Sequence, residues 1–520
     1  MSSHTRVNGH NGPEEAQLNR AGEVEDLIDA IKSLVVPFIR EADNAAPSRA
    51  SGYIATDSQG APGRNVLVDF HKPQELVKKL NISMPEEGVG REGFLDIVQT
   101  ILRYSVNTWD QGFMDKLYSS INPVGVASEL VLTVLNTNVH IYKTSPALTI
   151  IEKTVAKRLA TLFGFKGPRA GGVTCQGGSA SNLTSLVIAR NTLFPETKTS
   201  GNAGHRFALF TSEHGHYSVE KAAVACGMGS DSVVKVAVDS AGRMVPSALR
   251  EAIQGARDVG KTPLYVNATA GTTVWGSYDL FAEIAPICKE AGLWLHVDGS
   301  WGGPAIFSPS QRHKLAGAEH ADSLTVNPHK MLNVPVPCSF LLTSDVSVFQ
   351  RANTLRAGYL FHDPGDGDGD SDSDEIWDLA DLTLQCGRRG DALNLALAWV
   401  YYGETGLARR VDGAFAAAAH LATLVQQSGD FALLSSNPPP CLQVCFYYAP
   451  GGAPASDPEE NTRRTREMVA RLVSRGFMID YAPGEKGSLF RVVVNCQTLE
   501  GTVEGLVKAL REVGKEVVPL

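Results

Sequence analysis

The middle of the chain alternates short apolar runs with segments of helical spacing, and this pattern constrains the fold more than any other feature. Between residues 206 and 328 the apolar runs are rich in β-branched and aromatic residues. Strands that are apolar on both faces belong to parallel sheets covered by helices. The pattern therefore predicts an α/β fold around a mostly parallel sheet, with strands in RFALFTSE, VVKVAVD, PLYVNAT, LWLHVDG and SLTVNP.

The rest of the chain differs from this central region. The first residues are polar and have no apolar periodicity, which is typical of a disordered arm. Apolar residues at helical spacing predict a helix over Val24–Ile39, and the Ser/Ala/Gly-rich stretch Asn44–Gly63 is predicted to be a connection. Near the C-terminus a long helical stretch precedes the strand-like runs QVCFYYA and SLFRVVVN. We therefore expect a disordered arm over 1–22, an N-terminal helical segment over 23–132, a large ligand-binding domain over 133–388 and a smaller α+β domain over 389–520.

Composition excludes several classes of protein. The chain has 520 residues, 43% of them hydrophobic and 20% charged, as in ordinary soluble proteins, and it has no apolar run of 18 residues. The net charge of -9 argues against nucleic acid as a partner, so a small metabolite is the expected ligand. The eight cysteines form no CxxC pairs and no secretory leader precedes them, which predicts a reducing cytoplasmic location.

We expect no metal site. The acidic stretch Asp363–Glu375 resembles a calcium loop only superficially, because counting from Asp366 the sixth position is Ser371 and the twelfth is Trp377. A calcium loop requires glycine and glutamate at these positions. The stretch is therefore predicted to be a solvated acidic loop.

The first stretch that could bind a ligand is QGGSASN, residues 176–182. Its glycines allow close approach of a ligand, and Ser179 or Ser181 at a helix start leaves N–H groups and hydroxyls for an anion. It matches neither the dinucleotide nor the P-loop pattern, and no strand is predicted directly before it. Taken alone, it favours a plain helix start between glycines.

Two charged residues end apolar strands. Asp298 ends LWLHVDG, where a carboxylate suits a protonated ring nitrogen or a metal, with a helix N-cap as the alternative. Lys330 follows SLTV, and a buried lysine without a partner is costly, so it is a candidate nucleophile. The two lie 32 residues apart, one βα unit, which predicts adjacent strand ends facing one crevice.

An anion cradle, a strand-end carboxylate and a strand-end lysine together indicate a pyridoxal 5'-phosphate site. The lysine amine forms a Schiff base with this cofactor, and a carboxylate keeps the pyridine nitrogen protonated so that the ring accepts electrons.

Six motifs then show a family resemblance. In order along the chain they are TSEHGHYS, NATAGTTVWGSYD, LWLHVDGSWGG, ADSLTVNPHKM, RAGYLF and LQCGRR. From about Phe113 to the C-terminus the chain resembles the group II pyridoxal-dependent decarboxylases of glutamate, cysteine sulfinate, aspartate and aromatic amino acids. The resemblance implies the aspartate-aminotransferase-like fold, known as fold type I, and a homodimer with its active site at the subunit interface.

The same resemblance assigns a role to individual residues. Lys330 would bind the cofactor covalently, Asp298 would pair with its ring nitrogen, and His216 would stack on the ring opposite Ser300. Tyr359 would return a proton to the carbanion after decarboxylation, and Arg491 would bind a substrate carboxylate. In isolation, His216, Tyr359 and Arg491 have structural alternatives, as a core histidine, a packing tyrosine and a surface arginine. The remaining cofactor contacts implied are Thr273 beside Asp298, and Ser179, Ala180, Ser181 and Asn327 at the phosphate.

One departure from the family pattern lies beside Asp298. Family members usually read HVDAAWGG, whereas this chain has Gly299 and Ser300. The cofactor ring would then rest on a hydroxyl-bearing residue, and we expect cofactor binding to survive the change.

The expected substrate follows from FMDKLYSS, residues 113–120. In glutamate decarboxylases the matching segment holds the distal carboxylate with Gln and Ser, and here Lys116 and Tyr118 stand at those positions. A cation and two longer side chains favour a short acidic substrate. We therefore expect aspartate, giving β-alanine, or cysteine sulfinate, giving hypotaurine, over glutamate. The alternative is that Lys116 points to solvent, as most lysines do.

Three other functions stay open on the sequence. An aromatic or other bulky amino acid is the substrate if Lys116 points away, and an aldehyde synthase results if Tyr359 is misplaced. A non-catalytic regulatory homologue is the alternative of another class. The presence of Lys330, Asp298, His216 and Tyr359 argues against it.

Overall fold

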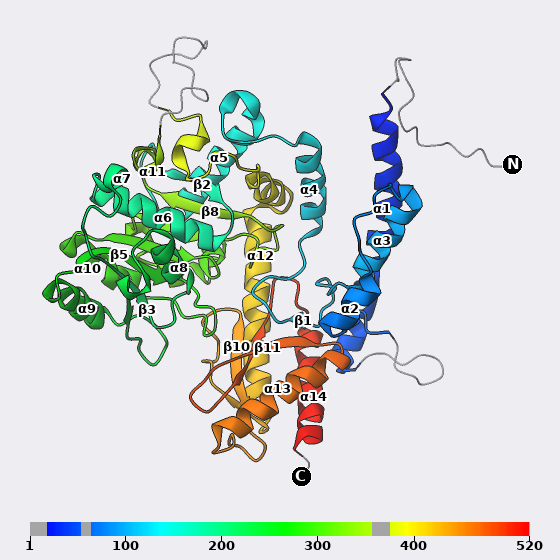
Figure 1. Ribbon diagram of the computed structural model, residues 1–520. Helices are drawn as coiled ribbons and strands as arrows, with labels where there is room; N and C mark the ends of the chain where they lie inside the picture. The colour runs from blue at the N-terminus through cyan, green and yellow to red at the C-terminus, as the bar shows by residue number, and fades with distance from the viewer. Residues whose placement is uncertain (1–17, 54–63, 356–374, 519–520) are drawn as a thin grey trace, which may run out of the picture. The chain divides into compact units, whose positions relative to one another are not determined.

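A computed structural model describes residues 18–53, 64–355 and 375–518, and these residues form two compact units (Figure 1). Unit 1 combines the chain up to Met114 with Thr462–Asp480 and from Leu499 onward. Unit 2 contains Asp115–Asn461 and Tyr481–Thr498. Each unit therefore combines separate stretches of the sequence, whereas each predicted domain is one continuous stretch.

Unit 2 is built on a mostly parallel sheet, as predicted. Within the described residues the sheet has seven strands in the order β2-β8-β7-β6-β5-β3-β4. Strands β3 to β7 pair in parallel, whereas β8 runs antiparallel to both of its neighbours. The strands span Gly171–Cys175 (β2), Phe207–Ser212 (β3), Val233–Val236 (β4), Thr262–Thr269 (β5), Trp294–Gly299 (β6), Ser323–Val326 (β7) and Ser339–Thr343 (β8). All five predicted strands are thereby confirmed.

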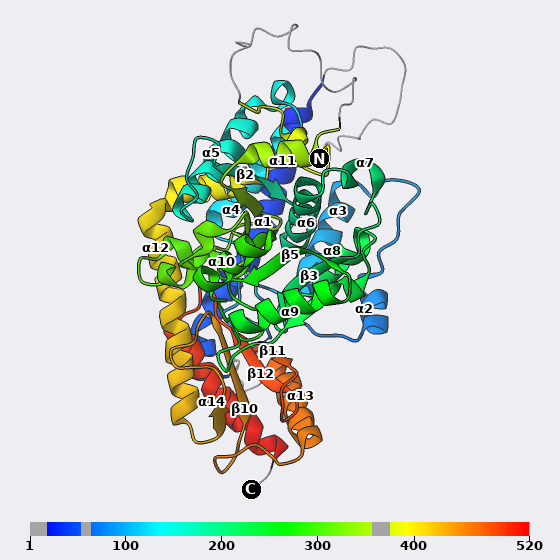
Figure 2. The same ribbon diagram turned by 90° about the vertical axis from the view of Figure 1, so that its left-hand side faces the viewer.

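Helices cover this sheet (Figures 1 and 2). Helix α6 packs on α8 and α11 over a core that includes Leu186, Leu209 and Phe349. Helices α9 and α10 pack against each other and against the sheet. The helices around the sheet are α5 (Pro146–Leu162), α6 (Gly178–Leu193), α7 (Thr197–Ser200), α8 (Ser218–Ala225), α9 (Pro246–Asp258), α10 (Phe281–Ala291) and α11 (Val346–Asn353), whereas α4 (Pro123–Leu135) packs on the later helix α12 (Ala392–Gln427).

One prediction about the sheet was wrong. Strand β2 ends at Cys175, directly before QGGSASN, where no strand was expected. The sequence GGVTC does not predict a strand, because glycine is generally unfavourable in strands. Here Gly172 is needed, since a Cβ on it would lie 2.1 Å from the Leu341 carbonyl oxygen of β8. The QGGSASN stretch therefore does follow a strand of the sheet.

The C-terminal part of unit 2 agrees with the predicted helix and strands. Helix α12 (Ala392–Gln427) is interrupted at Gly403, whose φ of 66° breaks the helical run. Figure 2 shows it as a long helix, and it packs on β9 and β10. Strands β9 (Phe431–Leu433), β10 (Gln443–Tyr448) and β12 (Leu489–Val493) pair antiparallel.

Unit 1 is formed by both ends of the chain. Helix α1 packs along α14 and α3, and β1 pairs in parallel with β11. A buried ion pair joins Arg49 of α1 to Asp110, with 2.7 and 2.6 Å hydrogen bonds. The elements of this unit are α1 (Arg20–Ser51), α2 (Pro73–Leu80), α3 (Gly90–Tyr104), β1 (Phe113–Met114), α13 (Pro458–Ser474), β11 (Met478–Ala482) and α14 (Glu500–Val517), of which α13 and β11 extend by a few residues into unit 2.

The N-terminal predictions need two corrections. Helix α1 begins at Arg20, inside the predicted disordered arm, of which residues 1–17 lie outside the described residues. The helix also continues to Ser51 through the predicted connection, because alanines favour helix and Arg49 is held by Asp110. Residues 54–63 of that connection lie outside the description. Among the described residues, no helix is both long enough and apolar enough to cross a bilayer.

A second buried ion pair supports the strand before QGGSASN. Arg388 and Glu152 are almost fully buried and lie 2.7 Å apart. Both bond to Thr174 of β2: Glu152 accepts from its backbone N–H at 2.8 Å, and Arg388 donates to its hydroxyl at 2.6 Å. Within the described part of the chain, Nε and Nη2 of Arg388 have no hydrogen-bond partner, so Glu152 is its directly paired carboxylate, while Asp391 interacts with it through charge.

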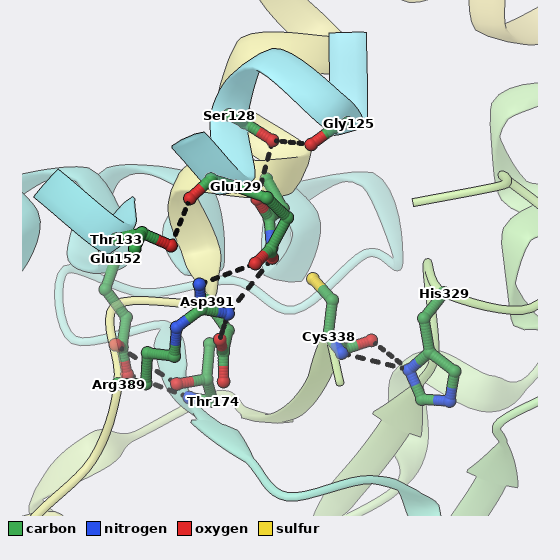
Figure 3. A network of polar contacts seen from close by, with 11 residues as sticks. Gly125, Ser128, Glu129, Thr133, Glu152, Thr174, His329, Cys338, Arg389 and Asp391 are labelled. Atoms are coloured by element: carbon green, nitrogen blue, oxygen red, sulfur yellow. Dashed lines mark hydrogen bonds and ion pairs between the residues drawn. The ribbon is translucent and has the colours of Figure 1, made fainter. Parts of the chain in front are cut away.

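Neighbouring charges extend this network, and Figure 3 shows Glu129 and Asp391 around Arg389. Arg389 donates to both carboxylate oxygens of Glu129, at 3.0 and 2.5 Å, and to Asp391 at 3.3 Å. Burial, together with the negative charges of Glu129 and Glu152, raises the pKa of Asp391 to about 7, although Arg389 opposes this. The network ties α4, α5 and the start of α12 to β2.

We expect Glu152→Ala to lower the free energy of unfolding by about 3–5 kcal/mol, because it leaves the Arg388 charge buried without a partner. The control is Glu404→Ala, which breaks the exposed pair between Glu404 of α12 and Arg158 of α5 and is expected to cost less than about 1 kcal/mol. Urea unfolding of the two variants measures the difference. Equal losses would contradict the proposed role of Glu152.

Candidate active site

The candidate residues meet at a cavity at the carboxyl ends of the strands in unit 2. The cavity has a volume of about 220 Å³. Strands β5, β6 and β7 bring Thr269, Asp298 and Thr325 into register beside one another. The predicted site residues that line the cavity are Ser179, His216, Thr273, Asp298, Ser300, Asn327 and Lys330. The prediction of adjacent strand ends for Asp298 and Lys330 is thereby confirmed.

Asp298 is a buried carboxylate that the surrounding groups keep ionised. Burial by itself raises its pKa, but hydrogen bonds from Ser300 and Asn182 and the positive charge of Lys330 more than offset this, so the pKa lies below its usual value. The Ser300 backbone N–H donates to Oδ1 at 3.1 Å, and the Asn182 amide donates to Oδ2 at 2.9 Å. A permanent negative charge at this position suits a protonated ring nitrogen.

A chain of hydrogen bonds holds Asn182 in this orientation. The Asn182 amide nitrogen also donates to Ser218 at 2.9 Å, so its oxygen faces His296 Nε2 at 3.1 Å and accepts. Burial lowers the pKa of His296 to about 4, which leaves the ring neutral. Ser323 contacts the other ring nitrogen at 2.8 Å. The direction of each bond therefore follows from the neutral state of His296.

Lys330 keeps some surface toward the cavity and is enclosed on its other sides. Burial lowers its pKa, while Asp298 raises it in part. A larger fraction of the amine is therefore uncharged than in a solvent-exposed lysine, and the uncharged amine is the nucleophilic form.

His216 is partly buried at the same cavity. Burial is the main reason that its pKa is lowered, with Lys330 and Lys221 adding to the effect and Asp298 opposing it. The backbone N–H of Ser218 donates to Nδ1 at 3.2 Å, so the proton of the neutral ring is on Nε2. His216 thus offers a neutral ring face and one N–H group.

The QGGSASN stretch also lines the cavity, through Gly178, Ser179 and Asn182. Helix α6 begins at Gly178, directly after Gly177, whose φ of 94° suits glycine. The N–H groups of Ser179 and Ala180 belong to the first helical turn and have no acceptor within the helix. They form the kind of helix start that binds phosphate. Ala180 itself packs against the core and does not line the cavity.

Ser181 lies differently from the predicted phosphate contact. Its hydroxyl contacts the Ser339 hydroxyl at 2.9 Å, and its N–H donates to the Gly177 carbonyl at 3.0 Å. Ser339 in turn contacts the Asn327 amide at 2.6 Å. Ser181 therefore positions Asn327 through Ser339, and a direct contact with phosphate stays a prediction.

Arg491 of β12 lies beside the cavity. Its guanidinium donates to the carbonyl oxygen of Thr273 at 3.3 Å and to that of Asp115 at 3.1 Å. Because Thr273 lines the cavity, the positively charged Arg491 directly contacts a residue of the cavity wall.

Lys116 and Tyr118 are not among the described residues that line the cavity. Lys116 lies 3.0 Å from Asp115 and is 45% exposed, and Tyr118 is 47% exposed. Their substrate contacts stay predictions. Tyr359, with nearly all of the acidic stretch 363–375, lies outside the described residues.

Pyridoxal phosphate fits this set of groups. A Cβ on Gly178 would lie 2.4 Å from Ser300 Oγ, so glycine leaves the space between them open. Among the described residues, the buried hydroxyls of Ser300 and Thr269 have no protein partner at the cavity. An anion-binding helix start, a buried lysine whose pKa is lowered and a buried carboxylate match the phosphate, the aldehyde and the ring nitrogen of the cofactor.

Several cavity residues were not singled out in the sequence. Most lie inside the motifs on which the resemblance rests, because His214 and Tyr217 flank His216 and Trp301 follows Ser300. His329 precedes Lys330, and burial lowers its pKa to about 4. Asn182 closes QGGSASN, but no local pattern indicates that it reaches Asp298. The additional lining residues are Gly178, Asn182, His214, Tyr217, Thr269, Gly271, Trp301 and His329.

Comparison with known proteins agrees with this site. The pyridoxal-dependent decarboxylase conserved domain matches residues 73–449. An L-aspartate decarboxylase of Metarhizium robertsii is 59% identical over 502 residues, covering 96% of this chain and 99% of the relative. A glutamate decarboxylase-like protein of Gibberella zeae is 39% identical, covering 88% of this chain and 94% of the relative.

Solved structures show the same fold. The crystal structure of mouse CSAD in apo form has a TM-score of 0.84 and 32% identity, covering 95% of this chain and all of that chain. The structure of Oryza sativa TDC with PLP and tryptamine has a TM-score of 0.83 at 23% identity, covering 96% of this chain and 99% of that chain.

Fold and site define a pyridoxal-phosphate enzyme of fold type I. The chain belongs to the pyridoxal-dependent decarboxylase family. It is a pyridoxal-phosphate-dependent amino-acid decarboxylase, and the alternative of a non-catalytic homologue is set aside.

We expect Asn182→Asp to weaken cofactor binding about tenfold or more. A second carboxylate beside Asp298 raises the pKa of Asp298, and each pKa unit corresponds to about tenfold in affinity for the protonated ring. Titration of the apoenzyme with pyridoxal phosphate, followed by absorbance, gives the apparent Kd. The control is Asn191→Asp on the same helix, whose amide bonds to the Ala352 carbonyl away from the cavity. An unchanged Kd in Asn182→Asp would show that Asn182 does not support Asp298.

Proposed function

We propose that this decarboxylase acts on L-aspartate and releases carbon dioxide to give β-alanine. The observation that carries the proposal is the 59% identity to an L-aspartate decarboxylase over nearly the whole length of both chains. The short, cationic substrate segment predicted around Lys116 favours the same choice. Cysteine sulfinate, glutamate and aromatic amino acids are the competing substrates.

The charge beside the cavity supports an acidic substrate. Arg491 presents a guanidinium next to Thr273, and a guanidinium binds a carboxylate in bidentate fashion. Such a residue suits an acidic amino acid, whose side-chain carboxylate stays in place when the α-carboxylate leaves as carbon dioxide. We propose that Arg491 binds a carboxylate of aspartate.

Several residues of the cavity would bind the cofactor and move protons during the reaction. Pyridoxal phosphate, when bound, supplies an electron-accepting ring that takes up the electrons left when the carboxyl group leaves. Asp298 would hold a proton on the ring nitrogen, Lys330 would provide the amine that reacts with the aldehyde, and His216 would place its neutral ring against one face of the cofactor. The helix start at Ser179 and Ala180 fixes the phosphate. We propose that Tyr359 returns the proton to the α-carbon.

We also propose that the chain works as a homodimer in the cytoplasm. Helix α4 of unit 2 exposes a row of large apolar side chains, with Val134 70% exposed, and Val400 and Tyr401 of α12 are exposed as well. An apolar surface of this kind favours burial against a second copy. The row on α4 comprises Val126, Leu130, Val131, Val134 and Leu135. Fractionation of the source cells tests the location.

The dimer is tested by sedimentation. We expect the wild-type protein to sediment with twice the chain mass, and Leu130→Glu together with Val134→Glu to shift it toward the monomer, because two charges cannot be buried unpaired. The control is Val259→Glu, at an exposed valine just after α9. A wild-type monomer, or an α4 variant that stays dimeric, speaks against this interface.

The substrate is tested by release of labelled carbon dioxide. We expect kcat/KM for L-aspartate to exceed that for L-glutamate by about tenfold or more, since one methylene alone gives about 10- to 200-fold discrimination in a fitted pocket. Cysteine sulfinate and L-tryptophan are also expected to react with a lower kcat/KM than L-aspartate. β-Alanine is the expected product. Lys330→Ala serves as the inactive control. A higher kcat/KM for any other amino acid refutes the aspartate proposal.

A further inference from the structure

Asn333 lies three residues after Lys330 and has an unusual backbone conformation. Its φ is 56°, in the left-handed region that residues other than glycine rarely adopt, and it is 1% exposed. Its N–H donates to the carbonyl oxygen of Lys330 at 3.3 Å. Such a conformation persists where surrounding contacts hold it in place.

The other hydrogen bonds of Asn333 among the described residues reach one segment, residues 119–122. Its side-chain amide donates to the Ser119 hydroxyl at 2.6 Å and to the Ser120 carbonyl at 2.9 Å. Its carbonyl oxygen accepts from the backbone and the side chain of Asn122, at 2.7 and 2.9 Å. One buried residue therefore joins the turn of Lys330 to this segment by four hydrogen bonds.

Two further side chains hold the same stretch of chain. Gln497 donates to the Ser120 hydroxyl at 2.9 Å and to the carbonyls of Ser120 and Ile121 at 3.2 and 3.3 Å. At the other end, Arg491 bonds to the Asp115 carbonyl. Lys116 and Tyr118, the predicted substrate contacts, lie between these attachment points.

This arrangement bears on how the enzyme chooses between acidic substrates. Aspartate and glutamate differ by one methylene group, so discrimination requires that the carboxylate-binding wall stay at a set distance from the reacting amine. A segment outside the sheet keeps such a distance only if it is tied to the element that carries Lys330. The Asn333 side chain supplies that tie.

We propose that Asn333 is a positioning residue for substrate choice, which fixes residues 115–122 against the turn of Lys330. The inference rests on the proposed action on acidic amino acids. It predicts that loosening the segment impairs selection of the shorter substrate and leaves cofactor binding intact.

The test variant is Asn333→Gly. Glycine adopts the left-handed conformation freely and keeps the carbonyl that accepts from Asn122, so only the two side-chain hydrogen bonds are lost. We expect the ratio of kcat/KM for L-aspartate to that for L-glutamate to fall about tenfold, mainly through a higher KM for aspartate. The absorbance band of the bound cofactor and its apparent Kd should stay as in the wild type.

Two companion variants make the test specific. Asn136→Gly introduces the same change at an exposed asparagine with a φ of 44° at the end of α4, and it should leave the ratio unchanged. Ser119→Ala removes one partner of the Asn333 side chain without touching the Lys330 turn, and should lower the ratio in the same direction by a smaller factor. It also keeps the inference testable if Asn333→Gly folds poorly.

The outcomes separate the two proposals. The wild-type enzyme alone decides whether aspartate is the preferred substrate. If it is, and Asn333→Gly and Ser119→Ala both keep the wild-type ratio, the inference about Asn333 is wrong while the proposed function stands. An equal loss of kcat/KM for both substrates, or a loss of cofactor binding, assigns Asn333 a merely structural role and also overturns the inference.

Discussion

A buried negative charge at the end of β6 is the constraint on which the site depends. Asp298 cannot stay ionised inside the protein without donors, so α6 must bring the Asn182 amide to one oxygen and the turn after β6 must bring the Ser300 N–H to the other. The amide in turn needs a neutral His296 behind it. The placement of α6, and with it the helix start that binds anions, is therefore coupled to the charge that the cofactor ring requires.

The sequence predicted the parts of the site that depend on local pattern. Apolar strands between helices gave the parallel sheet, and the spacing of Asp298 and Lys330 placed them on neighbouring strands, since adjacent βα units end at the same edge. Features that depend on packing were missed. Strand β2 was hidden by glycines that allow contact with β8, and the Ser181 hydroxyl turns to Ser339, which is 158 residues away. No local pattern shows such distant partners.

Reaction type and substrate choice have different structural origins in this enzyme. The groups that face the cofactor lie at one edge of a rigid sheet, where register fixes Thr269, Asp298 and Thr325 relative to one another. The segment that carries Lys116 lies outside that sheet and is held by side chains from later parts of the chain. On the proposed substrate role of this segment, substitutions in these side chains are expected to change which amino acid is accepted more than they change the chemistry, which suits a family that shares one reaction across several substrates.

The composition of unit 1 from both ends of the chain has a consequence for biosynthesis. Helix α1 ends at Ser51, whereas α14, on which it packs, begins only at Glu500. At about 5–20 residues per second, the ribosome takes on the order of a minute to make the intervening chain. During that time α3 can already pack on α1, but the face of α1 that packs on α14 stays uncovered while the sheet of unit 2 is emerging. Unit 1 can therefore be completed only after the last residues of unit 2 have been synthesised.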